Sequence, residues 1–231
     1  MIRILFALLI GMLCATESLF AQSPPAPADS SLLQYIPGGM NIIVGKSLLL
    51  PIGKLDSVPL RPRSGTFFIG VGIKAPIRNP RWGLRFAPAL AWRTYDYKQS
   101  GNKTFPTTDS TNIIERQRFS YVQAQLSGFF NLTLDARQKP LVWAEIGITP
   151  MYMINAVYIA KAKNADSQVE THKVNGLKDI QPLAINALGR VGYKSFALEW
   201  QWHTQPFVAE GSKGYRYPFM QYMELGAVIL L

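Results

Sequence analysis

The amino-acid sequence predicts an all-β fold: an eight-stranded antiparallel up-and-down transmembrane β-barrel, preceded by a cleaved signal peptide. Three observations predict it. From about Gly39 onward, apolar residues recur with a period close to two, which is typical of β-strands. Long polar segments alternate with short turns between the expected strands, as in outer-membrane barrels. Bulky apolar residues gather on one face of the strands, and small or polar residues on the other.

Residues 1–21 predict a secretory signal peptide. Arg3 supplies the positive start, and residues 4–15 form an apolar run that is too short to span a bilayer. Cleavage is expected after Ala21. We therefore expect an exported protein that resides in the outer membrane.

After cleavage, residues 22–38 would form a flexible periplasmic leader rich in Pro, Ala and Ser, and residues 39–231 the outer-membrane β-barrel. A lipoprotein signal on Cys14 is the weaker alternative, because Leu13 stands where a small residue is expected. If Cys14 leaves with the signal peptide, the mature chain has no cysteine, which excludes disulfides and thiol catalysis. No later segment offers the roughly 18 uninterrupted apolar residues of a membrane helix.

Eight strands are expected, and most have the roughly 9–11 residues that a tilted strand needs to cross a bilayer. They lie at residues 40–50, 66–76, 82–97, 115–134, 141–158, 180–192, 195–207 and 217–231. The long polar connections are residues 51–65, 98–114, 159–179 and 208–216. The short turns lie near Asn79 and Pro80, from Ala136 to Lys139, and at Tyr193 and Lys194. An even strand count places the long loops outside and the turns and termini in the periplasm.

Individual strands raise particular points. The first, residues 40–50, is apolar nearly throughout and shows no clean alternation. Pro88 and Pro150 lie inside strands, where each removes a ladder hydrogen bond, so we expect local bulges there. The last, residues 217–231, would be an aggregation-prone edge in a soluble domain. In a closed barrel it pairs with the first strand, and no edge remains.

Side-chain volume decides which face points toward lipid. An eight-stranded barrel has an interior just wide enough for side chains, so the bulky face must point outward. In chain order, that face comprises Phe67, Ile69, Val71, Ile73, Trp82, Leu84, Phe86, Leu90, Trp92, Val122, Leu126, Phe130, Leu132, Ile146, Ile148, Tyr152, Ile154, Leu183, Ile185, Val191, Phe196, Leu198, Trp200, Trp202, Phe219, Met223, Leu225 and Ile229. The aromatic residues expected at lipid are Trp82, Trp92, Trp200, Trp202 and Phe219.

The opposite face suits a narrow lumen. It is small or polar at Gly70, Gly72, Gly83, Ala87, Ala89, Ala91, Gln123, Gln125, Ser127, Asn131 and Asn186. Its charged residues are Lys74, Arg85, Arg93, Glu145, Arg190, Glu199 and Glu224, so four basic residues nearly balance three acidic ones. With a turn at Tyr193 and Lys194, Arg190 and Glu199 would be diagonal neighbours. Such a network is either a polar pathway for solutes or protons or a structural plug, and the narrow barrel favours the plug.

One histidine raises the question of catalysis. His203 is expected to point inward near the outer rim, with Glu199 four residues earlier and Glu210 and Ser212 in the next loop. A lipid hydrolase or acyltransferase would need such a set, but no motif supports it, so we expect a structural histidine and no enzyme. Clustered Cys or His ligands and glycine-rich phosphate loops are absent from the sequence, so neither a metal nor a cofactor is expected.

The chain has a formal charge of +10, and its long loops lean basic. Their basic residues are Arg61, Arg63, Lys98, Lys103, Lys161, Lys163, Lys173, Lys178, Lys213 and Arg216. Beside an outer leaflet, such loops could bind lipopolysaccharide phosphates through charge-assisted hydrogen bonds, or they could simply be solvated surface. Envelope proteins are further candidate partners. Nucleic acid is not expected for an exported barrel.

Two runs of residues resemble a known family. The run 65–72, followed by the run 82–88, is similar to the small outer-membrane barrels of Bacteroidota, the PorT-like outer-membrane β-barrel domain family. Residues 20–22, at the end of the signal, are similar to that group too. The resemblance covers residues 40–231 and implies no catalytic residues, although Leu231 departs from the aromatic that ends many such barrels. Three functions stay open: a structural or interaction component of the envelope or of a secretion assembly, a narrow pore, and a lipid-modifying enzyme.

Overall fold

The computed structural model of this chain describes residues 39–51, 60–77, 79–99, 112–135, 139–163, 167–176, 182–204 and 222–231. The chain separates into two compact units, residues 1–34 and 35–231, and every described residue belongs to the second unit. The predicted signal peptide and leader lie outside the described residues. Within the described ranges, no helix is long and apolar enough to cross a membrane.

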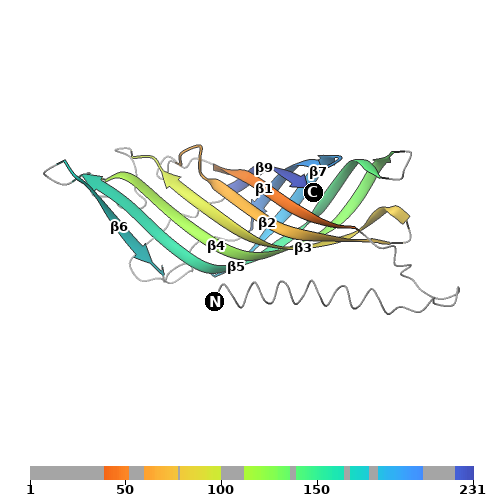
Figure 1. The fold of residues 1–231 in the computed structure, drawn as a ribbon, viewed down its shortest axis with the longest axis horizontal. Helices are drawn as coiled ribbons and strands as arrows, with labels where there is room; N and C mark the ends of the chain where they lie inside the picture. Colours follow the sequence, from red (N-terminus) through yellow and green to blue (C-terminus); the bar gives the residue numbers. More distant parts are fainter. Residues whose placement is uncertain are drawn as a thin grey trace. The chain divides into compact units, whose positions relative to one another are not determined.

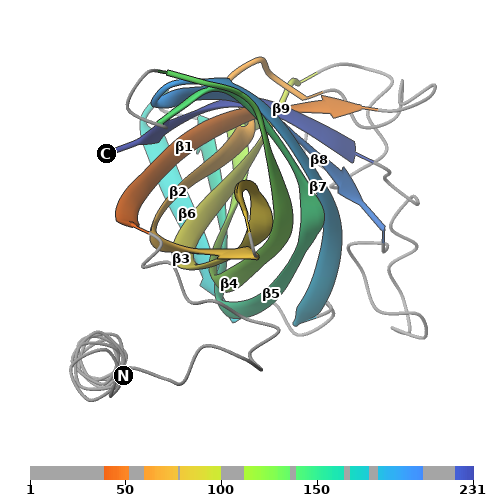
Figure 2. The ribbon, with the colours of Figure 1, turned by 90° about the vertical axis from the view of Figure 1, so that its right-hand side faces the viewer.

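All the regular secondary structure in the described ranges is β-strand. The strands are β1 (Met40–Pro51), β2 (Gly65–Ile77), β3 (Asn79–Tyr97), β4 (Asn112–Leu134), β5 (Pro140–Lys163), β6 (Val169–Asn175), β7 (Leu183–Tyr193), β8 (Phe196–His203) and β9 (Tyr222–Leu230). Antiparallel pairing runs from β1 through β2, β3, β4, β5, β7, β8 and β9 and returns to β1. Eight strands therefore form a closed ring, whose curvature is visible in Figures 1 and 2. The predicted eight-stranded barrel, including its apolar first strand, is confirmed.

The chain's C-terminal end and the short connections meet at one end of the ring, which we call the short-turn end. There β2 passes to β3, β4 to β5 and β7 to β8, and β1 begins where β9 ends. The backbones of Ile42 and Leu231 exchange two hydrogen bonds of 2.9 Å, which help to close the ring. The longer connections, after β1, β3, β5 and β8, leave from the opposite end, the long-loop end. This alternation is the one that the sequence predicts.

One strand departs from the predicted layout. The sequence predicts a loop over residues 159–179, but β5 continues to Lys163 and β6 pairs with its last seven residues. Because β6 pairs with β5 alone and all its residues are exposed, it lies outside the ring, at the far left of Figure 1. The loop prediction is wrong for this segment. Both faces of β6 are polar or charged at several positions, so it lacks the apolar alternation that would have revealed a strand.

The β7–β8 turn begins one residue later than predicted. Lys194 occupies its first position with a φ of 50°, and Tyr193 still belongs to β7, where it pairs with Phe196. The two bulky side chains are thereby paired on the exposed face, which stabilises the hairpin. As a result, Arg190 stands directly opposite Glu199, and the predicted diagonal placement is wrong.

Neither strand proline causes a bulge. The β2–β3 ladder is interrupted opposite Pro88 and resumes in the same register, and the β4–β5 ladder is interrupted in the same way opposite Pro150. On its other side each proline stays paired, Pro88 with Ala124 of β4 and Pro150 with Ile185 of β7. The expected bulges are therefore wrong at these two sites. A missing N–H donor is accommodated by breaking one ladder locally, without inserting an extra residue.

A shift of register does occur further along β5. Its ladder with β4 skips one residue between Met153 and Asn155. The extra residue reverses the alternation of β5, so that Ala156 and Ala160 are buried beyond it although the inward residues before it carry odd numbers. Ile154, which the sequence places at lipid, is half-buried at this point.

Candidate functional site: a charged lumen inside an apolar barrel

Large apolar side chains cover the outer face of the ring. Trp82, Trp92, Trp200 and Trp202 are each between 41% and 45% exposed, and every ring strand adds further exposed apolar residues. Phe219, also expected at lipid, lies outside the described residues. Soluble monomers rarely expose contiguous apolar surface on this scale, whereas a membrane-spanning barrel presents an apolar band to lipid.

Charged residues fill the middle of the lumen and form what we call the central cluster: Arg85, Glu145, Arg190 and Glu199. Strand register places Glu145, Arg190 and Glu199 side by side on β5, β7 and β8. Nη1 of Arg85 lies 2.5 Å from Oε1 of Glu145, and Nη1 of Arg190 lies 3.3 Å from the other oxygen of that carboxylate. Nε of Arg190 donates to Glu199 at 2.6 Å. All four side chains are buried, so each charge depends on its partners.

Neutral amides extend the central cluster. Gln125 accepts a 2.7 Å hydrogen bond from Nη2 of Arg190. Gln201 donates to Oε1 of Glu199 at 2.9 Å and accepts from Asn186 at 3.2 Å. These amides satisfy some of the hydrogen-bonding groups that the ion pairs leave over, whereas Nε and Nη2 of Arg85 and Nε2 of Gln125 have no hydrogen-bond partner.

A second group, the Glu224 cluster, lies nearer the long-loop end. Nη2 of Arg93 lies 2.7 Å from Oε1 of Glu224, and Nε2 of His203 lies 2.9 Å from the same oxygen. The Thr66 hydroxyl donates to this oxygen at 2.9 Å, and the Ser47 hydroxyl donates to Oε2. The buried carboxylate of Glu224, which lies on β9, thus has partners from β1, β2, β3 and β8. Neither hydroxyl residue is among the lumen residues predicted from the sequence, and neither carries a charge.

Met151 lies between the two groups. Its Sδ accepts contacts from Nη2 of Arg93 at 3.7 Å and from Nδ2 of Asn186 at 3.2 Å. A continuous chain of polar contacts therefore runs along the lumen. Together the two clusters take side chains from all eight ring strands: Ser47, Thr66, Arg93, Gln125, Glu145, Arg190, Glu199 and Glu224.

A third group, which the sequence did not reveal, lies at the long-loop end. The buried Asp96 binds Arg63 and Arg116, the latter at 3.2 Å, and Nε of Arg61 lies 4.0 Å away. The backbone N–H of Asp96 donates to the Ser64 hydroxyl at 3.0 Å. Strict alternation would place Asp96 on the lipid side, because its neighbour in sequence on each side points inward. Its burial depends on contacts with Arg61, Arg63 and Ser64, which precede β2. The sequence around Asp96 does not indicate these contacts.

Hydrogen bonds continue beyond the Asp96 group, between β3, the start of β4 and the part of β5 that pairs with β6. The Tyr97 hydroxyl donates to Gln117 at 2.7 Å, and the Tyr158 hydroxyl donates to Glu115 at 2.8 Å. Burial raises the pKa of Tyr158, so the phenol stays protonated and remains a donor. Gln99 donates to the other oxygen of Glu115 at 3.2 Å. The long-loop end is therefore lined by an ordered polar layer.

Lys74 is the predicted lumen residue that stands apart. It joins no ion pair with a described residue, and its Nζ lies 5.1 Å from the Phe129 ring and 5.4 Å from the Trp143 ring. Trp143 is fully buried, and its Nε1 donates to the backbone oxygen of Lys194 at 2.9 Å. Gly192 stands opposite this indole, where a Cβ would come within 2.2 Å of the ring. The glycine therefore makes room for the tryptophan.

The structure places all seven charged residues predicted for the lumen on the inward face, six of them in the two clusters and Lys74 apart. His203 contacts Glu224 in place of the nearby Glu199, and Glu210 and Ser212 lie outside the described residues. In the described ranges, no three Cys, His, Asp or Glu side chains lie close enough to hold a metal ion. Chemically, the two clusters pair carboxylates with arginines and so neutralise charge within the narrow lumen.

Comparisons with known proteins give a limited result. No family profile matches this chain, and no curated protein matches it in sequence, so the resemblance to the PorT-like family stays a prediction. Among solved structures, the chain is similar to Ail, the attachment invasion locus protein of Yersinia pestis, whose crystal structure holds the heparin analogue sucrose octasulfate. The two are 13% identical with a TM-score of 0.37, and the match covers 85% of this chain and 100% of Ail.

Proposed function

We propose that this protein is an integral outer-membrane β-barrel with a lumen closed by ion pairs, and that it serves as a structural or interaction component of the cell envelope or of a secretion assembly. The observation that carries the proposal is the placement of charge and bulk: apolar residues outside, ion pairs inside. A soluble barrel would bury the apolar face. A closed ring also pairs every ring strand on both sides, as the hydrocarbon core of a bilayer requires.

The packed lumen indicates that the barrel acts through its ends. The central cluster links β3, β5, β7 and β8 at one level, and an eight-stranded barrel has little interior beyond what these side chains occupy. In an outer membrane, the long-loop end would face outward and the short-turn end would face the periplasm. Contacts with partners would then form at these two surfaces.

Lipopolysaccharide is the partner that suits the long-loop end. Lys98, Lys163 and Lys173 are exposed there, and half of the Arg63 side chain is accessible beside Asp96. Lysine and arginine bind phosphate groups through charge-assisted hydrogen bonds. Of the other basic residues predicted for these loops, Arg61 and Lys161 are partly buried, and Lys103, Lys178, Lys213 and Arg216 lie outside the described residues.

One observation favours a second function, a narrow pore for small solutes. In the described part of the lumen, several buried polar atoms have no hydrogen-bond partner, among them Nε2 of Gln123 and of Gln125, Oγ of Ser127 and Oγ1 of Thr149. Buried groups of this kind commonly bind ordered water, and a file of water could carry ions or protons. The ion pairs on either side of these residues oppose such passage.

Conductance in planar bilayers distinguishes the two functions. The plugged barrel predicts no steady current, whereas discrete, stable current steps would establish the pore and contradict the plug. Electrophoresis of the detergent-folded protein with and without boiling tests the barrel itself, because a folded barrel migrates differently from its heated form. A soluble periplasmic product without such a shift would overturn the membrane assignment. Crosslinking in intact cells, followed by identification of the captured proteins, would name the envelope partners.

A further inference from the structure

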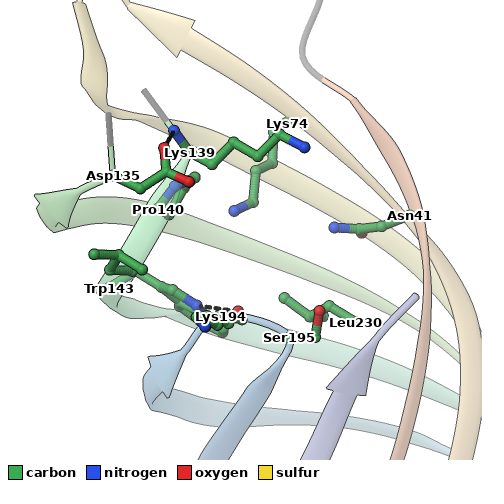
Figure 3. A pocket seen from close by; sticks show the side chains of 10 residues that line it. Asn41, Lys74, Asp135, Lys139, Pro140, Trp143, Lys194, Ser195 and Leu230 are labelled. Atoms are coloured by element: carbon green, nitrogen blue, oxygen red, sulfur yellow. Dashed lines mark hydrogen bonds between the residues drawn. The ribbon is translucent and has the colours of Figure 1, made fainter. Parts of the chain in front are cut away.

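A pocket opens at the short-turn end, remote from the long loops. Its volume is about 360 Å³, within the range typical of small-molecule sites. Figure 3 shows the side chains that line it: Asn41, Lys74, Asp135, Lys139, Pro140, Leu141, Trp143, Lys194, Ser195 and Leu230. These residues come from β1, β2, β5 and β9 and from the β4–β5 and β7–β8 connections, so the pocket exists only in the closed barrel.

The pocket has a strong positive balance. Three lysines line it, Lys74 from β2, Lys139 from the β4–β5 connection and Lys194 from the β7–β8 turn. Asp135 is the single acidic residue of the lining, and its Oδ1 already accepts a 2.8 Å hydrogen bond from the backbone N–H of Lys139. Three positive charges and one negative charge leave a formal balance of +2. Two units of negative charge would neutralise it.

Lys74 gives the pocket its inner charge. The residue is half-buried, and its ammonium group faces the rings of Phe129 and Trp143 without an ion pair to any described carboxylate. Aromatic faces stabilise a cation less than a counter-ion does, so the ammonium of Lys74 still favours an anionic partner. The attraction between an anion and this half-buried ammonium would be stronger than the same attraction in open water. In contrast to the arginines deeper in the lumen, this lysine has charge available for a ligand.

The rest of the lining supports an ionic group on an organic stem. Asn41 and Ser195 offer uncharged hydrogen-bonding groups, and Leu141 and Leu230 offer apolar wall. Trp143 forms a fixed part of the lining, because its Nε1 is bonded to the backbone of the β7–β8 turn. A rigid apolar wall beside cationic side chains is typical of sites that hold a charged head group by both its ionic group and its organic stem.

We propose that this pocket binds a phosphate monoester, carried either by a small periplasmic metabolite or by a lipid head group. A phosphate monoester carries a charge of about −1.5 to −2 near neutral pH, which matches the +2 balance. Lysine binds phosphate as a point charge on a flexible stem, so Lys74 and Lys139 can approach one group from separate elements. Lys194, whose Nζ lies 5.4 Å from the centre of the Tyr193 ring, would turn toward that group on binding. A single carboxylate would leave one charge unmatched.

Glycerol 3-phosphate is a suitable probe, titrated calorimetrically into the detergent-folded mature chain, with acetate at equal ionic strength as the comparison. We expect saturable binding that Lys74→Met weakens at least about tenfold, because one charge-assisted contact is lost. Lys194→Gln should weaken it several-fold, and the control Arg118→Gln, at an exposed position of β4, should leave it unchanged. Saturable binding that neither Lys74→Met nor Lys194→Gln weakens, equal binding of acetate, or no saturation would overturn the proposal.

Two additions make the test decisive. Heat-dependent electrophoresis reports whether each variant folds. If Lys74→Met does not fold, Lys139→Gln and Lys194→Gln carry the test, because both lysines are exposed at turns.

Nanodiscs with and without phosphatidic acid then distinguish a lipid head group from a soluble metabolite as the source of the phosphate. If phosphatidic acid abolishes the binding of glycerol 3-phosphate, the natural ligand is a lipid head group; if it does not compete, the ligand is a soluble phosphate monoester. Both results require the pocket to bind phosphate, and neither depends on the envelope role proposed above.

Discussion

Arg190 is the residue on which the central cluster depends most. Its guanidinium contacts Glu145 at 3.3 Å, Glu199 at 2.6 Å and Gln125 at 2.7 Å, so it joins β4, β5 and β8 to its own strand, β7. Arg190→Met keeps much of the side-chain length and removes the charge. Two buried carboxylates would then share Arg85 as their nearby cation, and Glu199 would keep Gln201 as its partner.

The expected cost follows from this arrangement. Removing one partner of a buried ion pair typically costs about 3–5 kcal/mol, because the other charge remains buried without compensation. Glu199→Gln alone should destabilise the barrel in the same way, by leaving Arg190 with one carboxylate. In the double variant both charges are gone and the pair of Arg85 and Glu145 is intact. We therefore expect the double variant to lose less than the sum of the single variants, with a coupling of about 0.5–3 kcal/mol.

Urea unfolding from lipid vesicles, followed by tryptophan fluorescence, measures these free energies. Lys163→Met serves as a control, since Lys163 is exposed outside the ring and its replacement should change stability by less than about 0.5 kcal/mol. Heat-dependent electrophoresis should show Arg190→Met unfolding at a lower temperature than the parent chain. Strictly additive single variants, or a cost for Arg190→Met no larger than that of the control, would refute the cooperative plug.

Three further predictions follow from the two faces of the ring. Brominated lipids should quench the fluorescence of a single-tryptophan chain that keeps Trp200, which is exposed, and spare one that keeps Trp143, which is buried; equal quenching would contradict the assignment of faces. Leu126→Arg on the outer face should cost about 2–4 kcal/mol in urea titrations from vesicles, and an unchanged midpoint would argue against contact with lipid. Gly192→Leu should displace the Trp143 indole and cost about 1–3 kcal/mol, visible as a shifted emission maximum of that single-tryptophan chain.

The sequence was sufficient for the barrel because two independent signals agreed. Alternation located the strands, and the volume of residues such as Trp92 and Phe86 decided which face could fit a narrow interior. The inward position of Arg190 and Glu199 followed from the same alternation. Their direct opposition did not follow, because it depends on a turn at Lys194 whose φ of 50° no composition rule anticipates for a lysine.

Other features escaped prediction where alternation fails. The register shift between Met153 and Asn155 reverses the faces of β5, and it leaves no mark in the local sequence. Asp96 is buried at a position that alternation assigns to lipid, because arginines that precede β2 or lie on β4 converge on it. The pocket at the short-turn end combines Lys74, Lys139 and Lys194, which are far apart in the chain and meet only when the ring closes. Such features depend on tertiary register, which a single sequence does not specify.

The distribution of polar contacts suggests how stability and function are divided in this barrel. Every ring strand contributes to the lumen clusters, so their charges act together to hold the eight strands in one register. A residue bound in that way cannot release its charge to a ligand without leaving a buried partner unpaired, at a cost comparable to much of the stability of a domain. Lys74 is free of that constraint, because its ammonium group faces two aromatic rings and forms no ion pair with a described carboxylate. Binding should therefore occur at the ends of the barrel, where charge is available, and the lumen should respond to substitution by unfolding.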